Sequence, residues 1–168
     1  MLGDFWEMCR GFSLLELLTS LVIIGILLGI GFGYAITTQR SQQIQSAGQE
    51  LQSFVETAKS IAHSHRSSMW IDIQSTNEAG EWSLDLIGQD DSRVLVLNGQ
   101  RFPLVSLQVN YRDDRILLLG ERGKISNGSL IMTINTDLSQ GLKLITSYGA
   151  GRVRVCSIKG AAYGYSAC

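Results

Sequence analysis

An uncharged apolar segment near the start of the chain limits most strongly what this sequence can fold into. From Phe12 to Thr38 the only charged side chain is that of Glu16, and Leu17–Ile36 consists mostly of Leu, Ile, Val and Gly. A helix needs roughly 20 such residues to cross the hydrocarbon core of a bilayer. A carboxylate inside such a segment is costly unless it is paired. The sequence therefore predicts a membrane-spanning helix in which Glu16 has a positive partner or lies at the membrane surface.

The residues in front of this segment do not form an ordinary secretory signal. Residues 1–11 are too few and too polar to supply the charged and apolar regions of such a signal. The pattern Gly11-Phe12-x-x-x-Glu16 before an uncharged run resembles the class III signal of type IV prepilins and type II secretion pseudopilins. The resemblance implies that a membrane-embedded prepilin peptidase cuts between Gly11 and Phe12. It also implies that Phe12 is then N-methylated.

The same resemblance implies a partner for Glu16. In assembled fibres of this family, the acid at this position is expected to meet the new terminal amine of a neighbouring subunit. A buried carboxylate that is paired only after assembly favours the correct register, because the unpaired charge is costly. We therefore expect Glu16 to be an assembly contact with other pilin or pseudopilin subunits.

The cysteines are consistent with removal of the leader. The chain contains three, which is an odd number for an exported protein, and the implied cut removes Cys9. Cys156 and Cys168 remain, and in an oxidising compartment a disulfide between them would close a short loop and hold the carboxyl terminus. The alternative is a pair of free thiols in a cytosolic protein.

Beyond the uncharged segment, the helical pattern becomes amphipathic. Apolar residues recur at steps of three and four, which indicates one apolar helix face that continues to about His65. The residues of this stripe are Ile44, Ala47, Leu51, Phe54, Val55, Ala58, Ile61 and Ala62. The stripe is expected to pack on the following domain. His63 and His65 are two residues apart, face different sides of a helix and are interpreted as surface or helix-end residues.

From Met69 the apolar periodicity changes to two, which indicates half-buried strands. The expected strands are 69–74, 81–87, 93–97, 104–111, 115–119, 129–135, 142–147 and 153–158. Asn98-Gly99 is a strong turn signal. Short strands at regular spacing predict an antiparallel sandwich or sheet, with the helix stripe as a further layer.

This arrangement resembles the GspH/FimT branch of minor pilins and pseudopilins, in which a long amino-terminal helix carries an all-β head. Residues 119–124, 128–131 and 148–154 look like the carboxyl-terminal pattern of that branch. The resemblance implies an α+β, pilin-like fold. It also implies a single-pass protein of the inner membrane, with its head in the periplasm, that enters a pilus fibre after assembly.

Four parts are expected along the chain. They are a leader peptide (1–11), a transmembrane and fibre-core helix half (12–38), an amphipathic helix half (39–67) and a β-rich periplasmic or extracellular head (68–168).

The sequence contains no catalytic constellation. A G-x-S-x-G motif, a P-loop and an H-E-x-x-H motif are all missing. We therefore expect no enzymatic activity, no cofactor and no metal site. Asp90-Asp91 and Asp113-Asp114 are interpreted as solvated loop charges, with a bound calcium ion as the alternative.

Positive charge is concentrated near the carboxyl terminus, although the whole chain has a formal net charge of only −1. No acid follows Asp137, so the later basic residues form a locally positive region. These residues are Lys143, Arg152, Arg154 and Lys159. On a strand, Arg152 and Arg154 would point to the same side because they are two residues apart.

Basic side chains beside flexible glycines and tyrosines suit a phosphate backbone. FimT-like minor pilins that carry Gly-Arg-x-Arg near this position are linked to DNA uptake, so Gly151-Arg-Val-Arg154 is a candidate contact with double-stranded DNA. The alternative is that the arginines pair with acids elsewhere in the head or on neighbouring subunits.

The sequence thus predicts a minor pilin that helps to prime or cap a type IV pilus, with DNA binding as a second hypothesis. A minor pseudopilin of a type II secretion system is the alternative, because the two classes share the signal and the fold.

Overall fold

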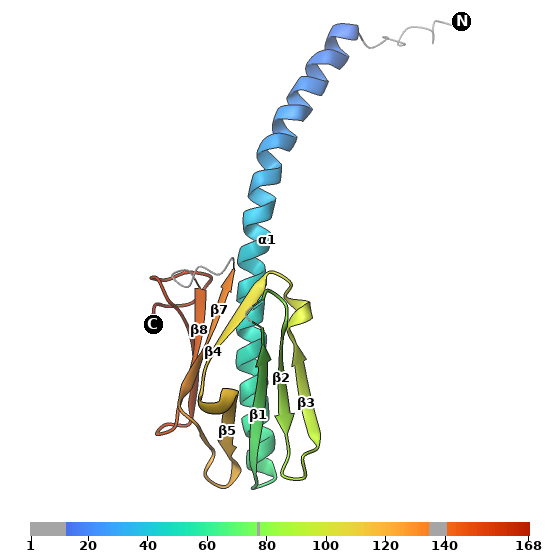
Figure 1. Cartoon of the computed structure of the whole chain (residues 1–168). Coiled ribbons are helices and arrows are strands. Elements are labelled where there is room, and N and C mark those ends of the chain that lie inside the picture. Colours follow the sequence, from blue (N-terminus) through green and yellow to red (C-terminus); the bar gives the residue numbers. More distant parts are fainter. Residues whose placement is uncertain (1–12, 77, 135–140) are drawn as a thin grey trace, which may run out of the picture. The chain divides into compact units, whose positions relative to one another are not determined.

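The structure is a computed structural model of the chain, and it describes residues 13–76, 78–134 and 141–168 (Figure 1). The side chains of residues 30–35 also lie outside this description. The predicted cleavage site at Gly11 and Phe12 is therefore not among the described residues. The chain divides into two compact units, residues 1–38 and 39–168, and each is considered by itself.

The helix α1 spans Leu14–Ser64. It begins after Ser13, whose Oγ accepts a hydrogen bond from the backbone N–H of Leu15 at 3.2 Å, as expected for a residue that caps a helix. Glu16 is exposed in the first turn, and its backbone oxygen accepts hydrogen bonds from the hydroxyls of Thr19 and Ser20. No helix among the described residues is both long and apolar enough to span a membrane.

The second unit contains the rest of α1 and all the strands. Seven of the eight predicted stripe residues are buried, and Ile61 is partly buried against the same core. The predicted amphipathic helix is thus present, and it ends at Ser64, close to the expected position.

Two antiparallel sheets pack with this part of α1. The five-stranded sheet has the order β3-β2-β1-β5-β6. Its strands are β1 (Ser68–Ser75), β2 (Trp82–Ile87), β3 (Arg93–Asn98), β5 (Arg115–Leu119) and β6 (Lys124–Ile125). The four-stranded sheet has the order β4-β7-β8-β9. Its strands are β4 (Val105–Asn110), β7 (Gly128–Ile134), β8 (Gly141–Ser147) and β9 (Arg152–Ser157).

Among the described residues, three short 3-10 helices occur in the connections. They are η1 (Gly99–Arg101), η2 (Arg112–Asp114) and η3 (Gly120–Arg122).

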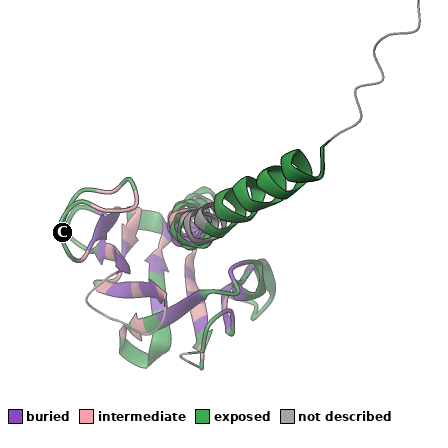
Figure 2. Ribbon diagram, turned by 90° about the horizontal axis from the view of Figure 1, so that it is seen from above, coloured by how far each residue is buried: buried purple, intermediate pink, exposed green. Residues whose placement is uncertain are grey.

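One hydrophobic core joins the helix stripe to both sheets. Buried residues alternate with less buried ones along the strands, as Figure 2 shows in purple and pink. The five-stranded sheet contributes Ile71 and Leu118, and the four-stranded sheet contributes Met132 and Leu144. The predicted α+β architecture, a long helix with an antiparallel β head, is confirmed.

The turn at Asn98-Gly99 is present, but it does not form a hairpin. Gly99 starts η1, which leads the chain out of the five-stranded sheet and into β4 of the other sheet. A Cβ atom on Gly99 would lie 2.5 Å from a ring carbon of Trp82. Glycine is thus needed here because an aromatic ring packs directly on the backbone. The two-residue strand β6 is too short to give a periodic signal and is missed in the sequence.

Candidate functional site

The predicted basic residues meet on the four-stranded sheet. In the pairing of β8 with β9, Lys143 lies opposite Cys156, Ile145 opposite Arg154 and Ser147 opposite Arg152. Cross-strand partners share a face of a sheet. Lys143, Arg152 and Arg154 therefore lie on one face.

This face is opposite to the core. The alternate residues of the two strands, such as Leu144 and Val155, are buried in the hydrophobic core. Arg152 and Arg154 are exposed, and Lys143 is partly buried. Lys159, the fourth candidate, follows β9 and is also exposed. The structure thus places three of the four residues on one surface, which we call the basic face (Lys143, Arg152 and Arg154).

The basic face is not neutralised within the described part of the chain. Three ion pairs are found there: Arg93 with Asp85 at 3.3 Å, Arg101 with Glu50 at 2.9 Å and Arg115 with Asp72 at 2.6 Å. None of them involves Lys143, Arg152, Arg154 or Lys159. The alternative of pairing with acids of the same head therefore has no support among the described residues.

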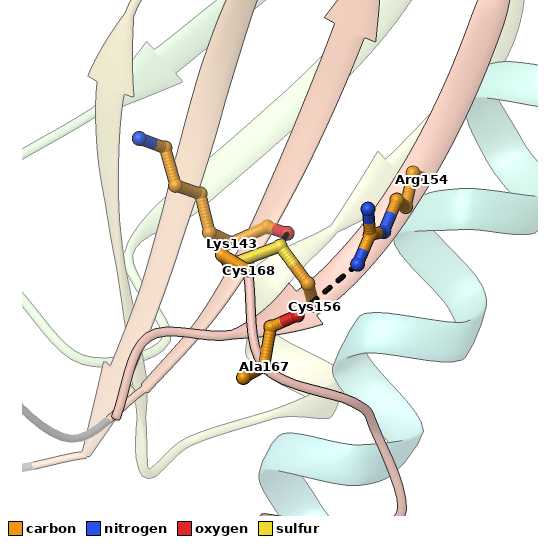
Figure 3. Close-up of a disulfide and its surroundings, with 5 residues drawn as sticks. All are labelled: Lys143, Arg154, Cys156, Ala167 and Cys168. Atoms are coloured by element: carbon orange, nitrogen blue, oxygen red, sulfur yellow. Dashed lines mark hydrogen bonds between the residues drawn. A yellow bond between two sulfur atoms is a disulfide. The ribbon is translucent and has the colours of Figure 1, made fainter. Parts of the chain in front are cut away.

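A disulfide holds the carboxyl terminus beside the basic face. Cys156 and Cys168 are bonded, with an S–S distance of 2.11 Å, as Figure 3 shows. The backbone N–H of Cys168 donates to the carbonyl oxygen of Ser157 at 3.0 Å, so the tail pairs with the end of β9. The guanidinium of Arg154 donates from Nη2 to the carbonyl oxygen of Ala167 at 3.1 Å. The tail thus fixes the position of Arg154.

An open cleft of about 610 Å³ adjoins the start of β9. It is lined by Glu56, Lys59, Ser60, His63, Gly123, Gly151, Arg152 and Val153. Four of these residues, Glu56, Lys59, Ser60 and His63, come from α1, and the sequence did not indicate that they line a cleft. Lys59 and His63 lie outside the apolar stripe, and periodicity cannot tell which distant turn a polar helix residue reaches.

Two hydrogen bonds attach α1 to the turns around the cleft. The ammonium of Lys59 donates to the carbonyl oxygen of Gly151. Nδ1 of His63 lies 2.8 Å from the carbonyl oxygen of Gly120, so this nitrogen carries the proton and Nε2 is left for another partner. The interpretation of His63 as a helix-end residue agrees with its place in the last turn of α1.

Gly151 permits the close approach of two turns. Its φ is +57°, a conformation that favours glycine, and a Cβ atom would lie 2.7 Å from the carbonyl oxygen of Gly123. Lys124 follows Gly123 in the chain. Its ammonium lies 4.6 Å from the centre of the Tyr148 ring, in a cation–π contact. Lys59, Lys124 and Arg152 therefore place three basic residues around this end of the four-stranded sheet.

The acid pairs lie in exposed turns. Asp90 accepts hydrogen bonds from the hydroxyl of Ser92 at 2.7 Å and from its backbone N–H at 3.3 Å, and these bonds lower the pKa of Asp90. Asp113 and Asp114 belong to η2. In the described part of the chain, no three His, Cys, Asp or Glu side chains are grouped as metal ligands.

Comparisons with known proteins find a matching sequence motif and two solved structures with a similar fold. The prokaryotic N-terminal methylation motif matches residues 8–32, which include Gly11, Phe12 and Glu16. Two crystal structures of the type IV minor pilin FimU from Pseudomonas aeruginosa (strain PAO1) have similar folds. The form in space group P21 has 20% identity and a TM-score of 0.57, and the match covers 68% of this chain and 88% of that chain.

The form in space group P65 has 19% identity and a TM-score of 0.54, and the match covers 67% of this chain and 91% of that chain. A search of curated protein sequences gives no significant match. At these identities the likeness shows the fold. The resemblance to minor pilins that the sequence indicates is thus confirmed at two separate points, the amino-terminal motif and the β head.

Proposed function

We propose that this protein is a minor pilin, a structural subunit that enters a type IV pilus through the amino-terminal half of α1. The observation that carries the proposal is that one chain contains both an amino-terminal methylation motif and a β head with a pilin-like fold. A methylation motif at residues 8–32 overlaps the start of α1, and this helix leads into a β head with a fold similar to that of a minor pilin. The motif accounts for membrane insertion and processing, and the head supplies a folded surface.

Processing and assembly follow from the motif. A prepilin peptidase cuts after Gly11, Phe12 becomes the methylated amino terminus, and Glu16 becomes the fifth residue of the mature chain. The carboxylate of Glu16 then pairs with the terminal amine of a neighbouring subunit. Before assembly, residues 12–38 anchor the protein in the inner membrane, residues 39–67 form the amphipathic helix half and the head of residues 68–168 lies in the periplasm.

Mass spectrometry of the full chain tests the processing. In cells with an active prepilin peptidase, the mature protein should begin with N-methylated Phe12, and Gly11→Val should block the cut. A wild-type chain that keeps Met1 in such cells would contradict the proposal.

Fibre incorporation tests the role of Glu16. The variant Glu16→Gln removes the charge and keeps the size, so it should be processed normally and recovered in sheared fibres in smaller amounts. Glu56→Gln is the matched control, because Glu56 is an exposed acid on the same helix outside residues 12–38. Equal incorporation of both variants would mean that Glu16 has no assembly role.

A subunit that primes or caps the fibre should, when deleted, lower the number of fibres more than their length.

We further propose that the basic face and Lys159 contact double-stranded DNA during uptake. Support comes from the shared face of Lys143, Arg152 and Arg154, and from the lack of ion pairs to these residues in the described part of the chain. A few such contacts give weak binding that depends strongly on salt, because each neutralised phosphate releases counterions.

Fluorescence anisotropy with labelled duplex DNA and the full chain in detergent tests this contact. Arg152→Ala and Arg154→Ala should each weaken binding and lower the salt slope by about 1. Arg112→Ala is the charge-matched control, because Arg112 is exposed on η2. If the three variants bind DNA equally well, the basic face is not the DNA contact.

A minor pseudopilin of a type II secretion system is the alternative function, because its precursors share the class III signal. Gene deletion separates the two proposals. Loss of fibres with normal secretion supports the pilus, and loss of secretion with normal fibres supports the secretion system.

A further inference from the structure

The residues that line the cleft beside β9 carry more positive than negative charge. Lys59 and Arg152 line it, and Glu56 is the only acid among the lining residues, all of which the structure describes. Glu56 is exposed, and its Oε1 accepts a hydrogen bond from Gln52 at 3.1 Å. One of its carboxylate oxygens is therefore already hydrogen-bonded along the helix surface. The cleft therefore favours an anion.

Hydrogen bonds hold two side chains of the cleft, those of Lys59 and His63, in place before any ligand binds. The Lys59 ammonium has three N–H groups, and the carbonyl oxygen of Gly151 accepts from it. The hydrogen bond from Nδ1 to the carbonyl oxygen of Gly120 orients the ring of His63 and leaves Nε2 outside this bond. A site that is already ordered loses less conformational entropy when a ligand binds.

The end of α1 does not oppose an anion strongly. The last carbonyl groups of a helix carry partial negative charge when they have no partner. Here the carbonyl oxygens of Ile61, Ala62 and His63 accept hydrogen bonds from the backbone N–H groups of His65, Ser67 and Arg66. The negative end of the helix is thus largely satisfied by its own chain.

The cleft is continuous with the basic face. Arg152 belongs to both, because it lines the cleft and shares its side of β9 with Arg154. The volume of about 610 Å³ lies within the roughly 300–1,000 Å³ typical of small-molecule sites.

We propose that this cleft holds one phosphate-bearing nucleotide unit of a nucleic-acid backbone, with Lys59 and Arg152 as its charged contacts. The inference rests on the proposed DNA contact and extends it from the sheet to α1. The duplex would cross the basic face and insert one backbone phosphate between α1 and the turn from β8 to β9. His63 borders the same space.

Salt-dependent anisotropy with labelled duplex DNA and the full chain in detergent tests the cleft through Lys59→Met. This variant keeps most of the length of the side chain and removes its charge. The salt slope should fall by about 1 and affinity should drop. Glu56→Gln should have the opposite effect and raise the affinity, which loss of structure cannot imitate.

Glycine variants test the shape of the cleft without any change of charge. Gly151→Ala introduces a Cβ atom 2.7 Å from the Gly123 oxygen and 3.3 Å from the Lys59 ammonium, so DNA affinity should fall. Gly149→Ala is the matched control in the same turn, because a Cβ atom there meets nothing within 4 Å. Gly160→Ala controls for backbone strain, because Gly160 also has a positive φ, +68°, but open space around it.

The outcomes separate this inference from the proposed DNA contact. If Arg154→Ala weakens binding while Lys59→Met and Glu56→Gln leave affinity and salt slope unchanged, the cleft is not used and the basic face remains. If Gly149→Ala and Gly151→Ala bind DNA equally well, the shape of the cleft has no role. If the wild-type chain does not bind DNA at low salt, both proposals are wrong.

Discussion

The ammonium of Lys59 in α1 donates a hydrogen bond to the carbonyl oxygen of Gly151, which lies 92 residues later in the chain. This bond joins the second-to-last turn of the helix to the turn between β8 and β9. Gly151 is buried, so the bond from Lys59 supplies its carbonyl oxygen with a hydrogen-bond donor. The bond therefore helps to hold this turn, and with it the start of β9 at Arg152, against the helix.

Removal of this bond should destabilise the folded chain. Hydrogen bonds to charged groups contribute about 1.5–3 kcal/mol, and Met keeps the apolar contacts of the stem. Because Lys59 is only partly buried, we expect Lys59→Met to lower the free energy of unfolding by about 1–2 kcal/mol. Urea unfolding followed by circular dichroism measures the change. Lys159→Met is the control, because Lys159 is exposed after the end of β9. Equal stability of the two variants would show that the bond contributes nothing.

Gly120 should not tolerate any side chain. A Cβ atom there would lie 2.1 Å from the carbonyl oxygen of Ala62 and 2.3 Å from that of Ser67, and both are backbone atoms that cannot rotate away. We expect Gly120→Ala to destabilise the fold by about 3 kcal/mol, at the upper end of typical overpacking costs. Thermal unfolding compares it with Gly149→Ala, which should be nearly neutral. A Gly120→Ala chain as stable as this control would contradict the packing of η3 on the end of α1.

Tyr111 should make the protein sensitive to alkaline pH. Burial raises the pKa of Tyr111 to about 12, although its hydroxyl lies 2.9 Å from that of Thr146 and this bond acts in the opposite direction. In the unfolded chain the phenol loses its proton near pH 10. Between about pH 10 and 12 only the folded state keeps the proton, so stability is complete below pH 10 and falls by about 1.4 kcal/mol per pH unit above it.

The variant Tyr111→Phe should reduce this loss, because position 111 then has no phenol to titrate. Urea unfolding at pH 9, 10 and 11 measures the slope, and Tyr148→Phe is the control for an exposed tyrosine. If Tyr111→Phe keeps the slope of the wild-type chain, another group is responsible for the alkaline sensitivity.

The disulfide should stabilise the carboxyl-terminal segment and the fold as a whole. A bond between residues 12 apart restricts the unfolded chain, and loop-closure entropy predicts a contribution of about 3 kcal/mol. We expect Cys168→Ser to lower the unfolding free energy by about this amount and to expose the last residues to carboxypeptidase. Reductant should reproduce the effect in the wild-type chain and have none on the variant. Resistance of the reduced chain to digestion would show that the backbone bonds to Ser157 suffice.

Local patterns predicted the elements of this fold well. The stripe from Ile44 to Ala62 identifies a buried helix face because every third or fourth residue returns to the same side. The alternation from Met69 onward identifies the strands for the same reason, with a period of two. The shared face of Arg152 and Arg154 also follows from that period. In each case the signal lies within a few residues of the position it describes.

Other features depend on contacts between distant segments. Asn98-Gly99 indicates a turn, but only the structure shows that the ring of Trp82 packs on Gly99 and that the chain passes to the other sheet. Lys143 joins the two arginines only because the register places it opposite Cys156. Neither contact has a sequence signal, because each requires the sheets to be assembled first.

By itself the sequence determined the amino-terminal motif around Gly11, Phe12 and Glu16, the helix stripe and the strands, since these depend on covalent order and short-range periodicity. Only the tertiary structure decided that Lys59 and His63 face the same cleft as Arg152. Their positions along α1 fix which way they point from the helix axis. What they meet there depends on how the helix packs against two sheets, and that packing is set by the whole buried core.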